Sequence, residues 1–210
     1  MLPRETVREL LSPFAASLSD ETIGKLLVYL ELLMLWNRKI NLTAINTPEE
    51  CLTRHFGESF LISRIIALEG RLLDVGSGGG FPGLAIKLIA PEVEVVLLEP
   101  VAKKRAFLKE AARTCGMTSV RVESSRLEQF ARSEREGSFD MITVRAVGGL
   151  ESLIPQAAAL LKPGGCLCLW IGSGQAEEIR EQNPTLHWQE PLPIPLSHER
   201  QILVGRRRRD

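Results

Sequence analysis

The first third of the chain has apolar residues at helical spacing. From Asp20 onward they recur every three or four positions, which places them on one face of a helix. They are Ile23, Leu26, Leu27, Leu30, Leu33 and Met34. Residues 47–50, Thr-Pro-Glu-Glu, form a capping box with proline at the first helical position and predict a second helix start. Residues 36–43, which lie between, hold too many Asn and Thr to extend a helix and predict an ordered loop. Residues 3–65 are therefore expected to be helical apart from this loop.

From Arg71 the pattern changes to short apolar runs that alternate with amphipathic stretches. Strands are predicted at residues 72–75, 93–98, 119–123, 141–144 and 166–170, and helices at residues 81–90, 103–115 and 150–161. This alternation, with nearly continuous apolar strands, indicates an α/β fold in which right-handed crossovers wind a Rossmann-like parallel sheet. Residues 186–188 and 202–204 have no long helix between them and predict two antiparallel strands that close the sheet.

Length and charge limit the organisation and the partners. A chain of 210 residues with 44% hydrophobic residues is expected to form one main domain. We expect residues 1–65 to be a helical extension and residues 66–210 the sheet domain, packed as one compact monomeric unit. With 26 basic and 26 acidic residues the net charge is zero. A basic field over the whole surface is thereby excluded, so a nucleic acid would be bound through a local patch.

Cysteine usage and hydropathy predict a cytoplasmic protein. The four cysteines include no Cys-x-x-Cys pair, and the three histidines have no metal-ligand spacing, so no metal site is expected. The first residues lack the apolar region of a signal peptide. The longest apolar run, at residues 26–35, is too short to span a membrane.

A glycine-rich loop follows the first predicted strand, and it has two functional interpretations. Gly78, Gly80 and Gly83 fit the dinucleotide-binding pattern G-x-G-x-x-G, which is a weak match in so glycine-rich a run. Alternatively, Asp74 at the strand end leads into three alternating glycines, the first of them Gly76. A carboxylate at that point suits a ligand with an ammonium group. A tight turn without a ligand is the third interpretation.

The second predicted strand ends in Glu99, 19 residues after Gly80. An acidic residue there accepts hydrogen bonds from a ribose diol, which favours an adenosine cofactor and disfavours NADP. It does not distinguish NAD from S-adenosylmethionine. As a single residue it is also compatible with a solvated strand end.

The Leu-Lys-Pro-Gly-Gly turn at residues 161–165 resembles the turn before the fifth strand of many class I S-adenosylmethionine-dependent methyltransferases. Together with the loop that follows Asp74 and with Glu99, it extends this resemblance over residues 71–170. The resemblance implies S-adenosyl-L-methionine as the cofactor.

Further motifs are similar to those of one family, the bacterial small-subunit ribosomal RNA guanine-N7 methyltransferases, also called glucose-inhibited division protein B. The motifs span residues 30–205 and keep their order: Trp36-Asn37, Asn41-Leu42-Thr43-Ala44-Ile45, Arg54-His55 with Glu58-Ser59, Phe81-Pro82-Gly83, Lys103-Lys104-Arg105-Ala106-Phe107-Leu108, Ser125-Arg126-Leu127-Glu128 and Val144-Arg145-Ala146. The chain departs from the family at Glu58, where an Asp is usual. It also departs at Val144, where a Ser is usual, and at Ile171-Gly172, where Lys-Gly is usual.

The resemblance implies methyl transfer to N7 of one guanine in 16S rRNA, with a binding role for several residues. Gly76 and Phe81 would line the methionine side of the cofactor, and Leu127 and Glu128 would flank the adenine. Arg145 would lie between the cofactor and the target base and position them. From the physical arguments above we add Asp74, Gly78 and Glu99. The alternatives are a protein that binds S-adenosylmethionine without turnover, and a nicotinamide dehydrogenase.

Three basic clusters are candidates for contact with looped or single-stranded RNA. They are Arg38, Lys39, Arg54 and His55; Lys103, Lys104, Arg105 and Lys109; and Arg206, Arg207, Arg208 and Arg209. The last cluster is equally compatible with a disordered terminus.

Overall fold

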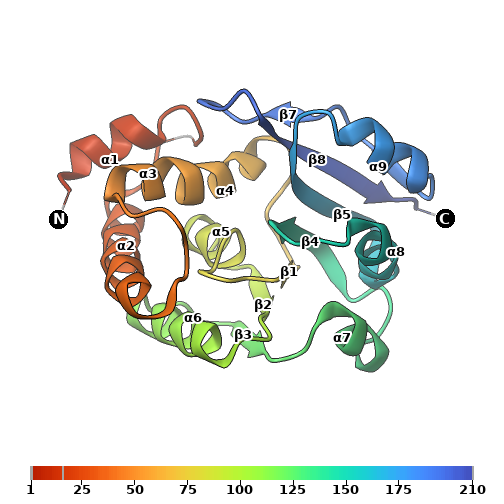
Figure 1. The fold of residues 1–210 in the computed structure, drawn as a ribbon, viewed down its shortest axis with the longest axis horizontal. Coiled ribbons are helices and arrows are strands. Elements are labelled where there is room, and N and C mark those ends of the chain that lie inside the picture. The colour runs from red at the N-terminus through yellow and green to blue at the C-terminus, as the bar shows by residue number, and fades with distance from the viewer. Residues whose placement is uncertain (1, 16, 210) are drawn as a thin grey trace.

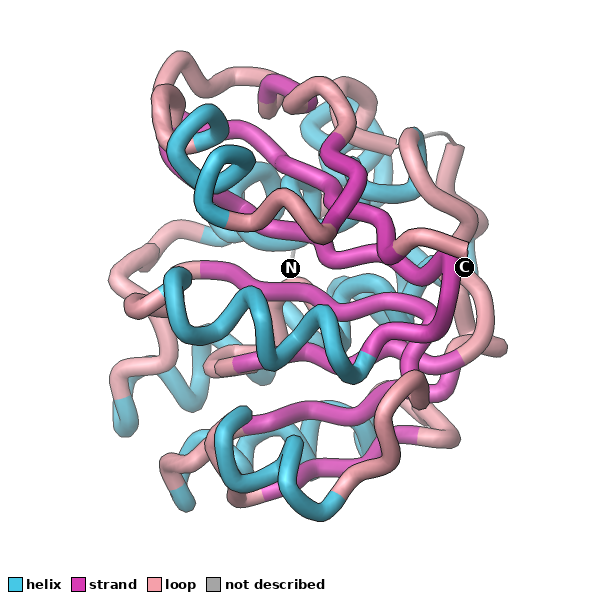
Figure 2. The backbone as a smooth tube through the Cα atoms, turned by 90° about the vertical axis from the view of Figure 1, so that its right-hand side faces the viewer, coloured by secondary structure: helices cyan, strands magenta, loops and turns pink. Residues whose placement is uncertain are grey.

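The computed structural model describes residues 2–15 and 17–209. Its centre is a mixed sheet with the strand order β3-β2-β1-β4-β5-β8-β6, and β7 pairs with β8. The neighbours from β3 to β5 run parallel, whereas β8 runs antiparallel to β5, β6 and β7. Helices cover both faces of this sheet (Figures 1 and 2). The predicted Rossmann-like α/β fold and its antiparallel closing strands are confirmed.

The strands and helices of the sheet domain begin and end close to their predicted positions. The strands are β1 (Arg71–Val75), β2 (Glu94–Leu98), β3 (Val120–Glu123), β4 (Phe139–Arg145), β5 (Leu161–Gly172), β6 (Leu186–Trp188), β7 (Leu192–Pro193) and β8 (Arg200–Arg207). The helices are α5 (Gly83–Ile89), α6 (Ala102–Thr114), α7 (Leu127–Ser133), α8 (Leu150–Leu160) and α9 (Ala176–Gln182). The sequence pattern did not predict α7, α9 or β7, each of which is seven residues or shorter.

The N-terminal extension is helical, as predicted, but one predicted loop is wrong. It contains α1 (Arg4–Leu11), α2 (Asp20–Ile40), α3 (Pro48–Cys51), α4 (Glu58–Phe60), a π-helical turn at Leu52–Gly57 and a 3₁₀ turn at Leu61–Arg64. Helix α2 continues through residues 36–40, which we predicted to be a loop, and ends where Asn41 adopts a left-handed conformation. The buried Asn37 does not break the helix, because its side-chain oxygen accepts a hydrogen bond from Thr43 N at 2.9 Å.

Each face of the sheet contributes to a different hydrophobic cluster. One cluster joins Leu72 and Met141 of the sheet to helices α5 and α6 and to the whole N-terminal extension, including Leu26 and Phe56. The other joins the strand residues of the opposite face, among them Leu73, Val75 and Val144, to α7, α8 and α9. Figure 2 views the molecule from the side of α8 and shows helices in front of the strands. We call the two surfaces of the sheet the extension face and the α8 face.

The C-terminal arginines are more ordered than a free tail. Arg206 and Arg207 belong to β8, and Arg207 Nη1 donates to the carbonyl oxygens of Ala159 (3.0 Å) and Leu161 (2.7 Å), at the end of α8. These two residues therefore fasten β8 to the end of α8. The Leu-Lys-Pro-Gly-Gly turn lies in the same region, as an irregularity within β5 opposite Phe139 and Met141.

The described part of the chain has neither a membrane-spanning helix nor a cluster of metal ligands. Within residues 2–15 and 17–209, no helix is long and apolar enough to cross a membrane. The same residues contain no group of three or more His, Cys, Asp or Glu side chains arranged for a metal ion.

Candidate functional site

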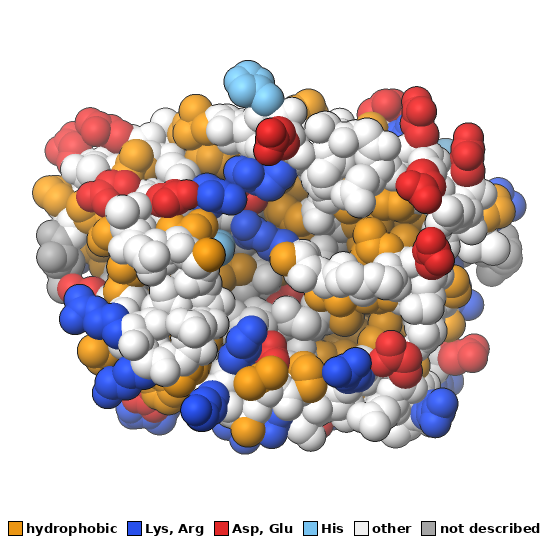
Figure 3. All heavy atoms as spheres, in the orientation of Figure 1, with side chains coloured by type: hydrophobic (Ala, Val, Ile, Leu, Met, Phe, Trp, Pro, Cys, Tyr) orange, Lys and Arg blue, Asp and Glu red, His pale blue; other side chains and the backbone are white. Residues whose placement is uncertain are grey.

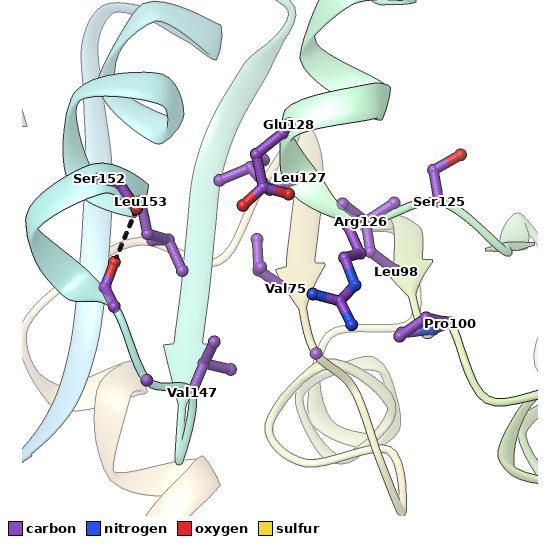
Figure 4. Close-up of a pocket in the computed structure, with 13 residues that line it drawn as sticks. Val75, Leu98, Pro100, Ser125, Arg126, Leu127, Glu128, Val147, Ser152 and Leu153 are labelled. Atoms are coloured by element: carbon purple, nitrogen blue, oxygen red, sulfur yellow. Dashed lines mark hydrogen bonds between the residues drawn. The ribbon is translucent and has the colours of Figure 1, made fainter.

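A cavity of about 220 Å³ lies at the carboxyl ends of β1 and β4. The strand order reverses here, because β1 connects through α5 to β2 on one side and lies beside β4 on the other. Open α/β sheets bind their ligands at this kind of crevice. The residues around the cavity are Val75, Gly76, Leu98, Pro100, Ser125, Arg126, Leu127, Glu128, Val147, Gly148, Gly149, Ser152 and Leu153. In Figure 4, Val75 lies at its centre, between Leu153 of α8 and Leu127 of α7.

The cavity brings together only some of the residues expected to bind the cofactor. Gly76, Leu127 and Glu128 line it, whereas Asp74, Gly78, Phe81, Glu99 and Arg145 do not. The sequence did not predict the wall formed by Val147, Gly148, Gly149, Ser152 and Leu153, although a Gly-Gly pair three residues after an apolar strand was a usable signal. Complete ligand pockets usually measure ~300–1,000 Å³. The cavity therefore matches part of a nucleoside cofactor rather than the whole of it.

Glu99 lies behind the glycine loop and orders it. The carboxylate is buried, with Oε2 accepting from Gly78 N at 2.9 Å and Oε1 accepting from Val101 N at 2.8 Å. Each carboxylate oxygen has two lone pairs, so both retain capacity for a ribose hydroxyl. Glu99 is thus not a solvated strand end, because its buried carboxylate binds backbone N–H groups of the glycine loop and of Val101.

Asp74 is fully buried at the end of β1. Its Oδ1 accepts from Thr143 Oγ1 at 2.7 Å, whereas Oδ2 has no hydrogen-bond partner in the described structure. Burial raises the pKa of this carboxyl to about 6, an effect that hydrogen bonding by Thr143, Ser77 and the Gly83 backbone and the charge of Arg145 partly oppose. At Gly83 an added Cβ would lie 2.7 Å from the Asp74 Cβ, so only glycine allows α5 to approach the carboxylate this closely. The unpartnered carboxylate oxygen retains capacity for a hydrogen-bond donor, but Asp74 does not line the cavity.

Phe81 does not line the cavity. Its ring is stacked between two rings of the N-terminal extension, those of Tyr29 (centroids 5.6 Å apart) and His55 (4.6 Å apart). The peptide bond between Phe81 and Pro82 is cis. Phe81 thus joins the glycine loop to the extension.

Arg145, at the end of β4, is held by a buried carboxylate from the extension. Its Nη2 lies 3.1 Å from Glu58 Oε2 and donates to the backbone oxygen of Arg54 at 2.6 Å. The other carboxylate oxygen of Glu58 binds Arg200 of β8 at 2.8 Å. Burial lowers the pKa of Arg145, an effect that Glu58 opposes. Because Arg145 Nη1 is buried without a partner, this arginine retains a donor for a ligand.

Comparison with known proteins places these features in a family. The model of the family GidB, rRNA small subunit methyltransferase G, matches residues 22–203, most of the chain. This chain belongs to that family.

Curated members of the GidB family are similar to it over most of their length. The ribosomal RNA small subunit methyltransferase G of Desulfitobacterium hafniense is 39% identical over 80% of this chain and 71% of the relative. The protein of the same name from Syntrophotalea carbinolica is 34% identical over 97% of both chains. Solved structures show the same fold at much lower identity. A SAM-dependent O-methyltransferase from Thermotoga maritima has a TM-score of 0.59, with 14% identity over 84% of this chain and 71% of that one. TYW2 from M. jannaschii, in complex with AdoMet, has a TM-score of 0.55, with 12% identity over 71% and 73%.

Three residues that depart from the GidB family pattern, Glu58, Val144 and Ile171, are buried in this fold. Glu58 makes the ion pairs with Arg145 and Arg200 described above, and Val144 packs in the cluster of the α8 face. Ile171 is likewise buried in that cluster. Glu58 therefore keeps an acid at the usual position, whereas Val144 and Ile171 replace polar groups by core side chains.

Some of the basic residues predicted to contact RNA are buried or bonded within the protein, and others are exposed. Burial lowers the pKa of His55 to about 3, with Arg145 and Arg54 acting in the same direction, so this side chain is a neutral imidazole rather than a cation. Arg105 Nη1 donates to the carbonyl oxygens of Glu99 and Pro100. Lys103, by contrast, is exposed on α6. Figure 3 shows Lys and Arg gathered over the region of α2 and α6 and around the hollowed middle of this face.

A second, larger hollow of about 530 Å³ lies along α2, where Leu27, Leu30 and Met34 are among its lining residues. Its lining contains no strand residue and none of the residues predicted to bind the cofactor, although Arg38 of the first basic cluster is part of it. The smaller cavity at β1 and β4 is therefore the candidate cofactor site.

Proposed function

We propose that this protein transfers a methyl group from S-adenosyl-L-methionine to N7 of a guanine in 16S rRNA of the small ribosomal subunit. Membership of the rRNA small subunit methyltransferase G family is the observation that carries the proposal. The glycine loop, the orphaned Asp74 oxygen and the cavity beside Leu127 and Glu128 support it, because they suit the two ends of a nucleoside amino acid.

In the proposed site the cofactor supplies a methyl group on a sulfonium, and the chain's own residues hold and orient it. Asp74 binds its ammonium group, and the backbone of Gly76 and Gly78 lies along its methionine side. Glu99 accepts from the ribose, while Leu127 and Glu128 flank the adenine. Phe81 acts from behind the loop, through its ring stack with Tyr29 and His55, rather than by lining the cavity.

The reaction needs no general base, because guanine N7 has an in-plane lone pair and no proton. Catalysis then depends on alignment of the attacking nitrogen with the methyl group and on exclusion of water. The methylated base acquires positive charge. We propose that Arg145 positions guanine O6 or a phosphate through its unpartnered Nη1, while Glu58 balances its charge.

Three further properties, the cellular location, the oligomeric state and the packing of the two parts of the chain, complete the proposal. We propose that the protein acts in the cytoplasm as a monomer, on ribosomal RNA or a ribosomal subunit. We also propose that residues 1–65 and 66–210 form one compact unit, because a single hydrophobic cluster includes side chains from both.

The test incubates the purified protein with radiolabelled S-adenosylmethionine and small subunits from cells that lack this gene. We expect one methyl group per subunit, located by mass spectrometry at a guanine as 7-methylguanosine. Subunits from cells that contain the gene serve as the control and should accept no label. Calorimetric cofactor binding without label on any RNA fraction would instead support a binding protein without turnover. Binding of NADH in place of the methyl donor would support a dehydrogenase.

A further inference from the structure

Tyr29 belongs to the middle of α2, far from the glycine loop in sequence, yet it contacts the loop directly. Its hydroxyl donates to the carbonyl oxygen of Gly79 at 2.6 Å, and the side chain is completely buried. A buried hydroxyl is costly unless it is hydrogen-bonded, and a phenylalanine would fill nearly the same volume. Packing alone therefore does not explain the phenol oxygen, whereas its hydrogen bond to the loop does.

The surrounding rings fix the direction of this hydroxyl. The Tyr29 ring is nearly parallel to Phe81, with 6° between their planes, and meets Phe56 edge-on at a centroid distance of 5.1 Å. Gly80 completes the contact, because a Cβ at this residue would overlap the Tyr29 hydroxyl. The aromatic packing and the absence of a side chain at Gly80 together bring the phenol oxygen to one carbonyl group of the loop.

The glycine loop is thereby held on two adjacent residues. On the side of β2, the Glu99 carboxylate accepts from Gly78 N; on the side of the extension, Tyr29 donates to Gly79 O. These two bonds restrain the peptide groups on either side of the Gly78–Gly79 peptide, where glycine would otherwise permit rotation. They add to the backbone hydrogen bonds that Ser77, Gly80 and Phe81 make at the two ends of the loop. We propose that Tyr29 is a positioning residue of the cofactor site, which fixes the glycine loop in its binding conformation and makes cofactor affinity depend on the N-terminal extension. This inference rests on the proposed function.

The expected size of the effect follows from the hydrogen bond. A typical hydrogen bond contributes ~1 kcal/mol net, and an orphaned buried acceptor costs more. If that energy holds the loop in one conformation, its loss lowers the fraction of binding-competent molecules, and the apparent dissociation constant rises by the same factor. We therefore expect cofactor affinity to fall by between about threefold and tenfold.

The experiment compares the full-length protein with its Tyr29→Phe variant, which keeps the ring stack. Titration calorimetry with S-adenosylmethionine should give the expected rise in the dissociation constant. The KM for the cofactor should rise by a similar factor, with kcat on small subunits little changed. Amide hydrogen exchange in residues 77–81 should become faster in the absence of cofactor.

Ser63→Ala is the matched control. It also removes one hydroxyl of the extension, which donates to Phe60 O at 2.8 Å, but it does not contact the loop. This variant should bind the cofactor as the unchanged protein does. A Tyr29→Phe variant with unchanged affinity and loop exchange would overturn the proposal, even if it melted at a lower temperature. Failure of the unchanged protein to bind S-adenosylmethionine would overturn the proposed function, and the role of Tyr29 with it.

Discussion

The two faces of the sheet differ sharply at the carboxyl ends of β1 and β4. On the extension face lie Asp74, Thr143 and Arg145, which are charged or polar and largely buried. On the α8 face lie Val75 and Val144, beside the cavity or in the core below it. Successive strand residues point to opposite faces, so one short stretch of each strand supplies both environments.

The difference separates the two tasks of the proposed site. The α8 face offers an apolar cavity that suits an adenine ring, whereas the extension face gathers the ionic groups suited to the methionine end and the target base. Of the two faces, only the extension face depends on the N-terminal helices for its arrangement, because Glu58, Tyr29 and His55 all come from them. A change at Arg145, proposed to face the target base, should therefore affect turnover most, whereas changes beside the cavity on the α8 face should affect cofactor affinity, as should the change at Tyr29 behind the glycine loop.

The largest effect is expected for Arg145→Ala. This variant removes the proposed contact to the base and leaves Glu58 with Arg200 alone. We expect kcat on small subunits to fall at least about a hundredfold, as is common when a positioning contact is lost. Loss of one partner of a buried ion pair should lower the free energy of unfolding by about 3 kcal/mol. Urea denaturation and single-turnover methylation measure the two quantities.

Arg200→Ala provides the control, because it removes the other partner of Glu58. A comparable loss of stability with a much smaller loss of kcat is expected. Equal losses of kcat in both variants would mean that Arg145 serves only to hold the extension on the sheet.

The second prediction concerns two buried groups, Asp74 and His55, whose pKa values burial shifts in opposite directions. Burial raises the pKa of Asp74 from 3.8 to about 6, so the folded state binds more protons than the unfolded state between these values. Stability from Asp74 therefore falls as the pH rises through this window. Burial lowers the pKa of His55 from 6.5 to about 3, so stability from this group rises with pH over the same window.

In the unchanged protein the two groups change the free energy of unfolding in opposite directions as the pH rises, so their effects partly cancel. A variant that lacks one group shows the pH dependence of the other. From pH 4 to pH 6 the Asp74→Asn variant should gain stability, and the His55→Gln variant should lose it, each by roughly 2–3 kcal/mol. Urea denaturation at several pH values measures both. Parallel profiles for the two variants would contradict the assigned directions.

A smaller effect is expected on the α8 face, at Glu128. Loss of one charged hydrogen-bonding group beside the adenine should raise the dissociation constant of S-adenosylmethionine about tenfold. Turnover at saturating cofactor should stay nearly constant. Glu151→Ala, which removes an exposed carboxylate of α8 outside the cavity lining, is the control and should leave the calorimetric affinity unchanged. A large loss of kcat in Glu128→Ala would contradict the prediction that this residue contributes to cofactor binding alone.

The smallest effect is expected at the surface, for the double variant Lys103→Ala, Lys104→Ala on α6. If these side chains contact phosphates, KM for the small subunit should rise a few-fold and its dependence on salt should weaken, while cofactor affinity stays constant. Arg113→Ala, near the other end of the same helix and paired with Glu110, removes one positive charge and is the control for each of the two single lysine variants. An equal change in Arg113→Ala and in the single lysine variants would indicate a general effect of charge.

The sequence predicts the framework of this fold better than its connections. Strand and helix positions in the sheet domain follow from periodicity, because each buried face repeats locally. The continuation of α2 past Trp36 was missed, since the side chain of Asn37 bonds to Thr43 only after the chain has turned back. Short elements such as α7 carry too few residues for a pattern to stand out.

The same distinction applies to the site. The glycine loop and Glu99 are recognisable because their chemistry lies in one short segment each. The contacts of Glu58 with Arg145 and Arg200 join residues 87 and 142 positions apart, and periodicity contains no information about such pairs. The sequence places His55 among basic residues, but its burial against Phe81 and neighbouring rings makes it neutral, and the sequence pattern does not reveal that burial.

The position of Tyr29 also provides the protein with its own spectroscopic label. The chain contains a single tyrosine, so isotope labelling of this residue type produces one set of ring signals. Those nuclei lie against Phe81, and the phenol proton lies on the hydrogen bond to Gly79. Burial also raises the pKa of this phenol, so the group stays protonated in ordinary buffers. One resonance would thus report the conformation of the glycine loop in the intact protein, and even in a complex as large as a ribosomal subunit, without a foreign probe.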